Sequence, residues 1–86
     1  MSNPKKPNPI DVHVGKRLRE AREECGLTQK VLAKKLGITH QQVQKYESGA
    51  NRISASKLLE IARFLDVSIG SFFECAPGNG SDQQQQ

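Results

Sequence analysis

The side chains that most often do chemistry are few in this chain, and they stand far apart in the sequence. Cys25 and Cys75 are fifty residues apart, which fits neither a disulfide scaffold nor a metal-binding C-x-x-C pair. His13 and His40 have no Cys or carboxylate at the spacing of a metal site or a catalytic triad, and no Gly-rich phosphate loop is present. Cys25 lies on an apolar helical stripe, which predicts a buried structural thiol. We therefore expect no enzyme, no metal, no cofactor and no small-molecule ligand.

Basic side chains are concentrated in the first two thirds of the chain. The 86 residues carry thirteen Lys or Arg against nine Asp or Glu, a formal charge of +4. Through Lys57 there are twelve cations against five anions, which gives +7, and from Leu58 onward one against four, which gives −3. This asymmetry favours a polyanionic partner such as nucleic acid. The alternative is a solvated face that only keeps the protein soluble.

The elements that must position these side chains are short helices. Apolar residues recur at helical spacing in five segments, and no window alternates as a strand does. Thr39, with Gln42 three residues later, predicts a capping box. The N-caps that we expect are Asn8, Thr28, Thr39, Ser54 and Ser68. The inward residues that we expect are Ile10, Val14, Leu18, Ala21, Cys25, Leu32, Ala33, Leu36, Val43, Tyr46, Leu58, Ile61, Ala62, Leu65, Ile69, Phe72 and Phe73.

The second and third predicted helices are joined through Gly37 in a way that is typical of a helix-turn-helix motif at about 29–48. Ala33 is small where the two helices come closest, and Gly37 adopts the positive φ of the turn without steric cost. Apolar residues then fill the angle between the helices from below: Ile38, Val43 and Tyr46.

Residues 18–73 resemble a helix-turn-helix domain of the lambda-repressor/Cro class, also called XRE-type. The similarity runs without a gap through Gly26-Leu27-Thr28-Gln29, Gly37-Ile38-Thr39 and Tyr46-Glu47-Ser48-Gly49, over about two thirds of the chain. The resemblance implies an all-α, five-helix lambda-repressor-like fold with double-stranded DNA as its partner.

In this family the outer face of the third helix enters the major groove of DNA. With Val43 and Tyr46 inward, steps of about 100° put that face at positions 41, 44, 45 and 48, with position 40 at its margin. A Gln side chain can form two hydrogen bonds with adenine, at N6 and N7, and a Lys side chain can donate to O6 and N7 of guanine. The resemblance therefore implies base contacts from His40, Gln41, Gln44 and Lys45. The alternatives are a merely solvated face and, for His40, a contact with phosphate or water.

The resemblance also implies contacts with the DNA phosphates at two places. One is the N-terminus of the second helix, where free N–H groups attract anions; the other is the loop after the third helix. The residues concerned are Thr28, Gln29, Ser48, Asn51 and Arg52. Thr28 is first of all a helix cap, and the alternative for Arg52 is simply an exposed loop arginine. Arg22 and Glu47 are expected to form a partly buried ion pair between the first and third helices.

The leading hypothesis is a sequence-specific transcriptional regulator, most often a repressor in this class. Because one small unit reads few base pairs, we expect a homodimer on a pseudo-palindromic operator with half-sites about 34–36 Å apart. Its contacts are expected from the last helix, through Ile69, Phe72 and Phe73, unless these residues only close the core. The second hypothesis is a protein-interaction module or antitoxin that uses the helix-turn-helix as a scaffold.

The chain divides into one domain at 9–76, a flexible basic arm at 1–8 and a disordered Gln-rich tail at 77–86. No run of about 18 apolar residues is present, so we expect no membrane segment, and the basic start lacks the apolar stretch of a secretory signal. We expect a cytoplasmic, nucleoid-associated protein with reduced thiols and no separate effector domain.

Overall fold

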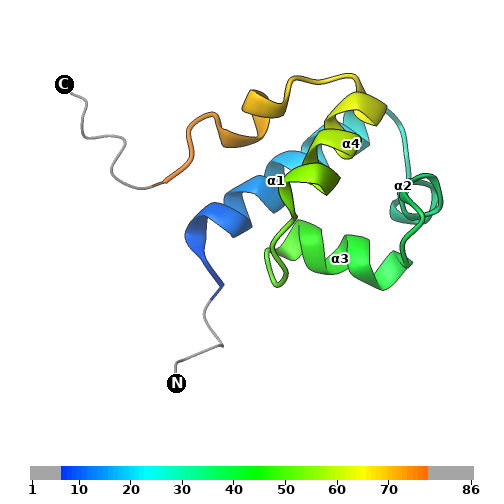
Figure 1. The fold of residues 1–86 in the computed structure, drawn as a ribbon, viewed down its shortest axis with the longest axis horizontal. Helices are drawn as coiled ribbons and strands as arrows, with labels where there is room; N and C mark the ends of the chain where they lie inside the picture. Colours follow the sequence, from blue (N-terminus) through cyan, green and yellow to red (C-terminus); the bar gives the residue numbers. More distant parts are fainter. Residues whose placement is uncertain (1–6, 78–86) are drawn as a thin grey trace.

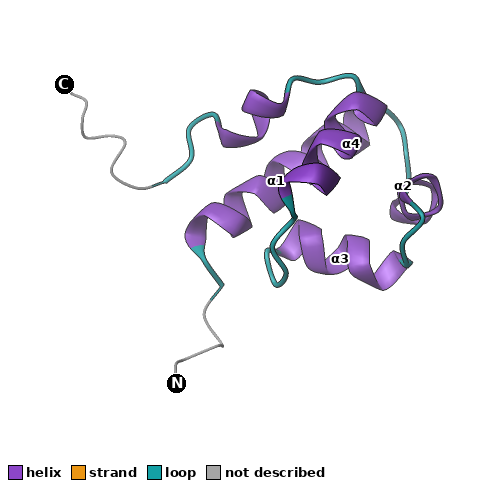
Figure 2. Ribbon diagram, viewed as in Figure 1, coloured by secondary structure: helices purple, strands orange, loops and turns teal. Residues whose placement is uncertain are grey.

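The computed structural model describes residues 7–77, which form four α-helices and one 3-10 helix, and no strand (Figures 1 and 2). The elements are α1 (Pro9–Glu24), α2 (Gln29–Leu36), α3 (His40–Ser48), α4 (Ala55–Leu65) and η1 (Ile69–Phe73). The all-α prediction is confirmed, but the last element is a 3-10 helix, because its turn closes through the i→i+3 bond from Ser71 N–H to the Ser68 carbonyl. Most of the predicted arm and tail, at 1–6 and 78–86, lies outside the described residues.

Each helix begins at a polar cap that the sequence predicts. The side chains of five residues accept a backbone N–H of the first turn: Asn8, Thr28, Thr39, Ser54 and Ser68. The predicted capping box is only half formed. Thr39 Oγ1 accepts the Gln42 N–H at 3.0 Å, but the Gln42 side chain donates from Nε2 to Asn51 Oδ1 at 3.2 Å instead of reaching back. Gln42 therefore joins α3 to the loop that follows it.

The turn between α2 and α3 has the geometry of the predicted motif. Gly37 ends α2 with φ +70°, in the left-handed region that glycine enters without steric cost. Its N–H donates to Lys34, and the Ile38 N–H donates to Ala33, which closes the last turn of α2. In Figure 1, α2 is seen nearly end-on while α3 runs across the view, so the two helices cross steeply.

The core consists of eleven buried apolar residues, and all of them lie on the predicted stripes. They are Val14, Leu18, Leu32, Ala33, Val43, Tyr46, Leu58, Ile61, Ala62, Leu65 and Phe72. The expectation of burial is wrong for Ile10, Cys25, Ile69 and Phe73, which are exposed. Ile10 lies in the first turn of α1, on an open groove, and Cys25 is the C-cap of α1, with its thiol 3.7 Å from the Leu65 carbonyl oxygen, so the neighbouring elements cover each of them only in part.

Two glycines let the backbone of α1 approach α3 closely. A Cβ on Gly15 would lie 2.3 Å from the Tyr46 carbonyl oxygen and 2.7 Å from that of Glu47. Gly49 ends α3 with φ +83°, and a Cβ there would lie 2.7 Å from Val12 Cα. The two helices pack through bare backbone at this point, which the apolar pattern of the sequence did not reveal.

In residues 7–77 no helix has the length and apolarity that a membrane crossing requires.

Candidate nucleic-acid interface

The outer face of α3 carries the polar side chains that the helical spacing predicts there. Val43 and Tyr46 are buried, with 0% and 9% exposure, and they hold the inner face of α3 against the core. Four residues on the other side are exposed, namely Gln41, Gln44, Lys45 and Ser48, and His40 is half-buried at the start of the helix. Their roles toward DNA stay predictions.

A buried ion pair joins α3 to α1. Arg22 Nε donates to Glu47 Oε2 at 2.6 Å and a terminal nitrogen of Arg22 donates to Oε1 at 3.1 Å, with only 9% and 4% of the two side chains exposed. The other terminal nitrogen donates to the Leu27 carbonyl at 2.7 Å, so the guanidinium also secures the loop before α2. The hydrogen bond to Glu47 raises the pKa of Arg22, although burial opposes this shift. Arg22 therefore stays a cation, and α3 cannot tilt without breaking the pair.

Gln29 begins α2, and its side chain is engaged within the protein. Its Nε2 donates to Glu47 Oε1 at 2.9 Å, and its Oε1 lies 3.1 Å from His40 Nε2. Thr28 accepts the Val31 N–H at 3.1 Å as the cap of α2. Hydrogen bonds thus connect the ion pair to the first residue of α3, an arrangement that the sequence did not predict for Gln29.

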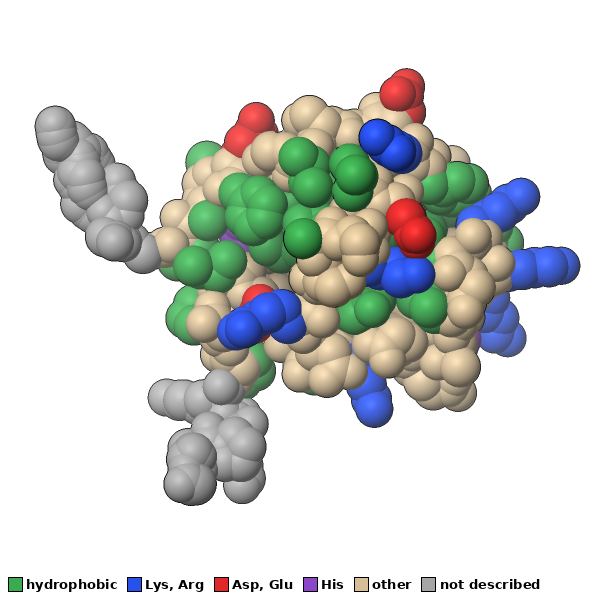
Figure 3. Space-filling model, viewed as in Figure 1, with side chains coloured by type: hydrophobic (Ala, Val, Ile, Leu, Met, Phe, Trp, Pro, Cys, Tyr) green, Lys and Arg blue, Asp and Glu red, His purple; other side chains and the backbone are tan. Residues whose placement is uncertain are grey.

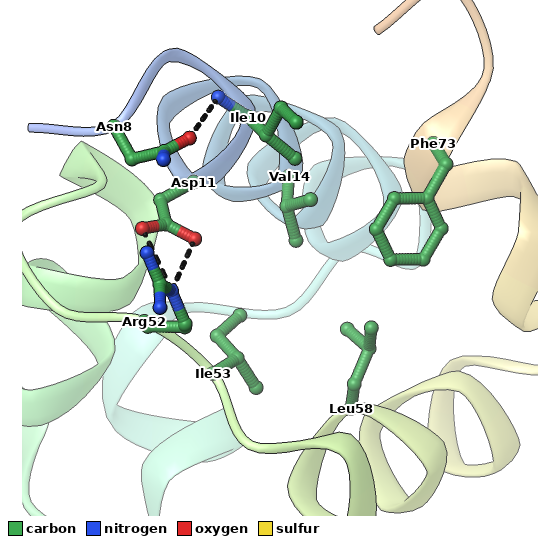
Figure 4. A pocket seen from close by; sticks show the side chains of 8 residues that line it. All are labelled: Asn8, Ile10, Asp11, Val14, Arg52, Ile53, Leu58 and Phe73. Carbon is green, nitrogen blue, oxygen red and sulfur yellow. Dashed lines mark hydrogen bonds and ion pairs between the residues drawn. The ribbon is translucent and has the colours of Figure 1, made fainter.

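The loop after α3 is organised by side chains that the sequence assigned to phosphate contacts. Arg52 Nε lies 3.1 Å from both carboxylate oxygens of Asp11, yet the Arg52 side chain remains 70% exposed (Figure 4). Its terminal nitrogens make no hydrogen bond to residues 7–77, and the hydrogen bond to Asp11 raises the pKa of Arg52. Asn51 accepts from Gln42 and donates to the Ala50 carbonyl, so its amide shapes the loop itself.

Cationic side chains cover the α2 side of the molecule. Figure 3 shows Lys and Arg side chains projecting from the edge at which Figure 1 draws α2. The lysines of α2 and the one lysine of α3 are all exposed, namely Lys30, Lys34, Lys35 and Lys45. Between residues 28 and 57 Glu47 is the single acidic residue, and its charge is paired with that of Arg22. The surface around the helix-turn-helix is therefore positive, as a polyanion partner requires.

An apolar groove lies on another part of the surface, between the start of α1, the α3–α4 loop and η1. Its volume is about 280 Å³, and its lining is mainly Ile10, Val14, Ile53, Leu58 and Phe73, beside the ion pair of Asp11 with Arg52 (Figure 4). Of the predicted dimer residues, Ile69 and Phe73 are 40% and 45% exposed. Phe72 is only 1% exposed, so it belongs to the core of the subunit and not to a dimer surface.

Residues 7–77 hold no cluster of three or more His, Cys, Asp or Glu side chains that could bind a metal ion.

A helix-turn-helix family profile matches residues 18–72, which cover α2, the turn and α3 together with their packing partners. The chain belongs to the helix-turn-helix family. As the sequence predicted, this family is the XRE or Cro-like type.

Two further comparisons place this helix-turn-helix chain among known proteins. It is 54% identical over 80 residues to an uncharacterized HTH-type transcriptional regulator of Sinorhizobium medicae (strain WSM419), a match that covers 93% of this chain and 58% of that protein. Among solved structures it is similar to the restriction-modification controller protein C.AhdI from Aeromonas hydrophila, with 35% identity and a TM-score of 0.67. That match covers 72% of this chain and 94% of C.AhdI. The chain thus spans less than two thirds of the curated relative and most of the controller protein.

The fold is also similar to part of the hydroxypropylphosphonic acid epoxidase from S. wedmorenis. The identity is 27% and the TM-score 0.71, over 80% of this chain and 35% of the epoxidase. The curated relative, by contrast, is named as an HTH-type transcriptional regulator. The helix-turn-helix fold therefore occurs both in regulators and as one part of an enzyme.

Proposed function

We propose that this helix-turn-helix chain is a transcriptional regulator that binds double-stranded DNA in a sequence-specific manner, at the nucleoid in the cytoplasm. The observation that carries the proposal is the outer face of α3. Gln41, Gln44 and Lys45 are exposed there together, on a helix whose other face is held by a buried core and a buried ion pair. A rigid helix with adaptable donors and acceptors on one face suits the reading of base edges in a major groove.

In this proposal α3 lies in the major groove, with its N-terminal residues nearest the bases. Gln41 and Gln44 pair with adenine and Lys45 with guanine, while His40 stands at the edge of the contact. The N–H groups at the start of α2 bind one phosphate, with Thr28 and Gln29 beside it. The second phosphate clamp is formed by the loop after α3, through Ser48, Asn51 and Arg52. The lysines of α2 raise the affinity for every sequence through counterion release.

We further infer that the regulator acts as a homodimer and represses transcription by occupying its operator. Phe73 is exposed where it lines the apolar groove, and Ile69 is exposed on the same 3-10 helix; a second copy would cover both. A two-fold dimer doubles the number of bases read and demands half-sites about 34–36 Å apart. The operator is then a pseudo-palindrome.

The test is selection of bound duplexes from a random DNA pool by the purified protein at about 150 mM salt, close to physiological ionic strength. The proposal expects an enriched pseudo-palindrome with half-site centres about 10 base pairs apart. Lys45→Ala removes one cation from α3 and abolishes the enrichment at one position. The matched control, Arg63→Ala, removes one cation from an exposed position of α4 and leaves the enriched sequence unchanged.

A protein-interaction module is the second candidate, and the apolar groove of about 280 Å³ is the observation that favours it. A scaffold of this kind needs no polar reading face on α3, but it does need an apolar surface for its partner. If the random pool yields no enriched sequence, and only weak salt-sensitive binding is seen, the DNA-reading proposal is wrong. The groove then becomes the surface on which to look for a partner.

A further inference from the structure

The buried ion pair determines the orientation of a neighbouring amide. Glu47 Oε1 accepts from a terminal nitrogen of Arg22 at 3.1 Å and lies 2.9 Å from the Gln29 side chain. A carboxylate that is paired with arginine has acceptor atoms only, so the Gln29 atom facing it must be the amide nitrogen. The Gln29 amide therefore cannot flip, and its carbonyl oxygen faces the other way.

That carbonyl oxygen in turn determines which nitrogen of His40 carries a hydrogen. Gln29 Oε1 lies 3.1 Å from His40 Nε2, and since a carbonyl oxygen only accepts, Nε2 must donate. His40 Nδ1 makes no hydrogen bond to residues 7–77. In the neutral ring Nδ1 then bears the lone pair, and it is the ring nitrogen left for a ligand from outside.

Gln44 is not held by the same network. Its Nε2 lies 3.5 Å from His40 Nε2, and two donors that face each other do not form a hydrogen bond. The Gln44 amide is thus able to turn toward whichever base it meets, while His40 is not.

We propose that Glu47 and Gln29 form a positioning relay that fixes the ring of His40 with Nε2 as donor and leaves Nδ1 as an acceptor for a DNA base. Adenine and cytosine present an amino group in the major groove, so His40 Nδ1 accepts from the amino group of whichever of these two bases the operator pair at this position contains. The inference rests on the proposed function. It makes Gln29 a residue that acts on specificity through His40, beyond any contact with phosphate.

The first test needs no DNA. Nitrogen-15 NMR of the histidine rings, recorded on the full chain where the rings are neutral, is expected to show His40 with a protonated Nε2 and a bare Nδ1. Gln29→Met removes the acceptor, so the two ring nitrogens of His40 become more alike as both tautomers are populated. His13 is an internal control, since its Nε2 lies 2.6 Å from the Glu74 carbonyl oxygen, far from Gln29 in the sequence. Its signals are expected to stay in place.

A protonated Nδ1 in the unmodified protein would overturn the relay. So would a His40 spectrum that is the same in the unmodified protein and in the Gln29→Met variant, once thermal unfolding has shown that the variant is folded. The measurement on the unmodified chain decides the first point even if the variant does not fold.

The second test repeats the selection from random DNA with Gln29→Met and with His40→Ala. The relay expects both variants to lose discrimination by about 3- to 10-fold at the same single position, the worth of one hydrogen bond. The double variant is expected to lose no more than either single one, because the two residues act as one unit. A Gln29 that acts only on phosphate would instead lower the affinity for all sequences alike, and that result would contradict the relay.

The two proposals fail in different ways. If the unmodified protein enriches no sequence, the proposed function is overturned together with the base-reading part of the relay, whereas the ring state of His40 is still measured by NMR. If the protein does enrich an operator, the adenine or cytosine at the position affected by His40→Ala is replaced by an analogue that lacks the exocyclic amino group. The relay expects weaker binding to this operator; unchanged binding overturns the relay, and the proposed function stands.

Discussion

At Gly15 the packing of two helices depends on the absence of a side chain. The nearest atoms to an added Cβ are backbone carbonyl oxygens, at 2.3 and 2.7 Å, and not the flexible end of a side chain. Backbone in the last turn of α3 cannot yield without moving the whole reading face. The residue is therefore a packing requirement of the site, although it lies on α1.

Gly15→Ala is expected to destabilise the domain by about 1–3 kcal/mol, the usual cost of overpacking. The measurement is urea or thermal unfolding followed by circular dichroism. Gly70→Ala serves as a matched control, since a Cβ on Gly70 meets nothing within 4 Å, and it should change the stability little. Equal stability of both variants would show that the backbones of α1 and α3 leave room for a methyl group at this point.

Gln41→Ala tests a single reading residue. Because Gln41 is exposed and makes no hydrogen bond to other side chains in residues 7–77, its removal should leave the fold intact. We expect a loss of about 1–3 kcal/mol on the best operator and a relaxed preference at one base pair. Titration of the operator and of single-base variants measures both effects. An equal loss on every sequence would mean that Gln41 does not read a base.

The placement of whole elements depends on two ion pairs that differ in burial. Arg22 and Glu47 are almost fully buried between α1 and α3, whereas Arg52 is exposed and joins the α3–α4 loop to Asp11. The hydrogen bond to Glu47 raises the pKa of Arg22. The charged Arg22 side chain thus contributes its full stabilisation at all pH values below the ordinary pKa of arginine. This stabilisation is lost only when the pH rises through the raised pKa of Arg22. Arg22 adds no pH dependence near neutrality.

Glu47→Ala leaves the Arg22 guanidinium buried without its partner. We expect a loss of about 3–5 kcal/mol in the free energy of unfolding, as for other broken buried pairs. Urea unfolding at neutral pH is the measurement. Glu60→Ala is the control, because Glu60 is 58% exposed in its pair with Lys57 and such pairs are worth below about 1 kcal/mol. Similar losses in the two variants would argue against a structural role of the buried pair.

Arg52→Ala tests the second phosphate clamp. The terminal nitrogens of Arg52 are available to DNA, so their loss should weaken binding to all sequences alike and lower the slope of affinity against salt concentration by about one unit. Fluorescence titrations at several salt concentrations, on operator and on random DNA, measure this. A changed sequence preference would contradict a phosphate contact.

At the scale of the whole molecule, an apolar surface beside η1 is left open to solvent. Ile10, Ile69 and Phe73 are each at least 40% exposed, and the groove that Ile10 and Phe73 line is apolar. Covering the aliphatic and aromatic side chains of such a patch with a partner removes them from water, and this lowers the free energy of the complex. The proposed homodimer would provide that partner.

Phe73→Ser is expected to shift the protein from dimer to monomer and to lower its affinity for a two-site operator, with little effect on the fold. Sedimentation equilibrium gives the association state directly. Phe64→Ser is the matched control, since Phe64 is 40% exposed on α4 and does not line the groove. A monomeric unmodified protein, or equal effects of both variants, would exclude this dimer surface.

Much of the fold could be predicted from local pattern, because helix caps and apolar spacing act within one or two turns of chain. All five N-caps and all eleven core residues were foreseen in this way. The errors lie at element ends, where Ile10 and Cys25 continue the stripe of α1 but are covered only in part by the neighbouring elements. Phe72 and Phe73 are neighbours of the same type, yet only the packing of η1 decides which of them is buried.

For the candidate site, the exposed face of α3 follows from the helical spacing of its nine residues, once Val43 and Tyr46 are placed inward. The partners of its side chains do not. Gln29 was expected on phosphate, yet it bonds Glu47 and His40 across two helices, and Gln42 bonds the next loop instead of its own cap. Such contacts join residues that are distant in sequence, so no local pattern encodes them. Periodicity and capping therefore sufficed for the elements and their faces, whereas the hydrogen-bond directions that aim the reading side chains arise only when α1, α2 and α3 are packed together.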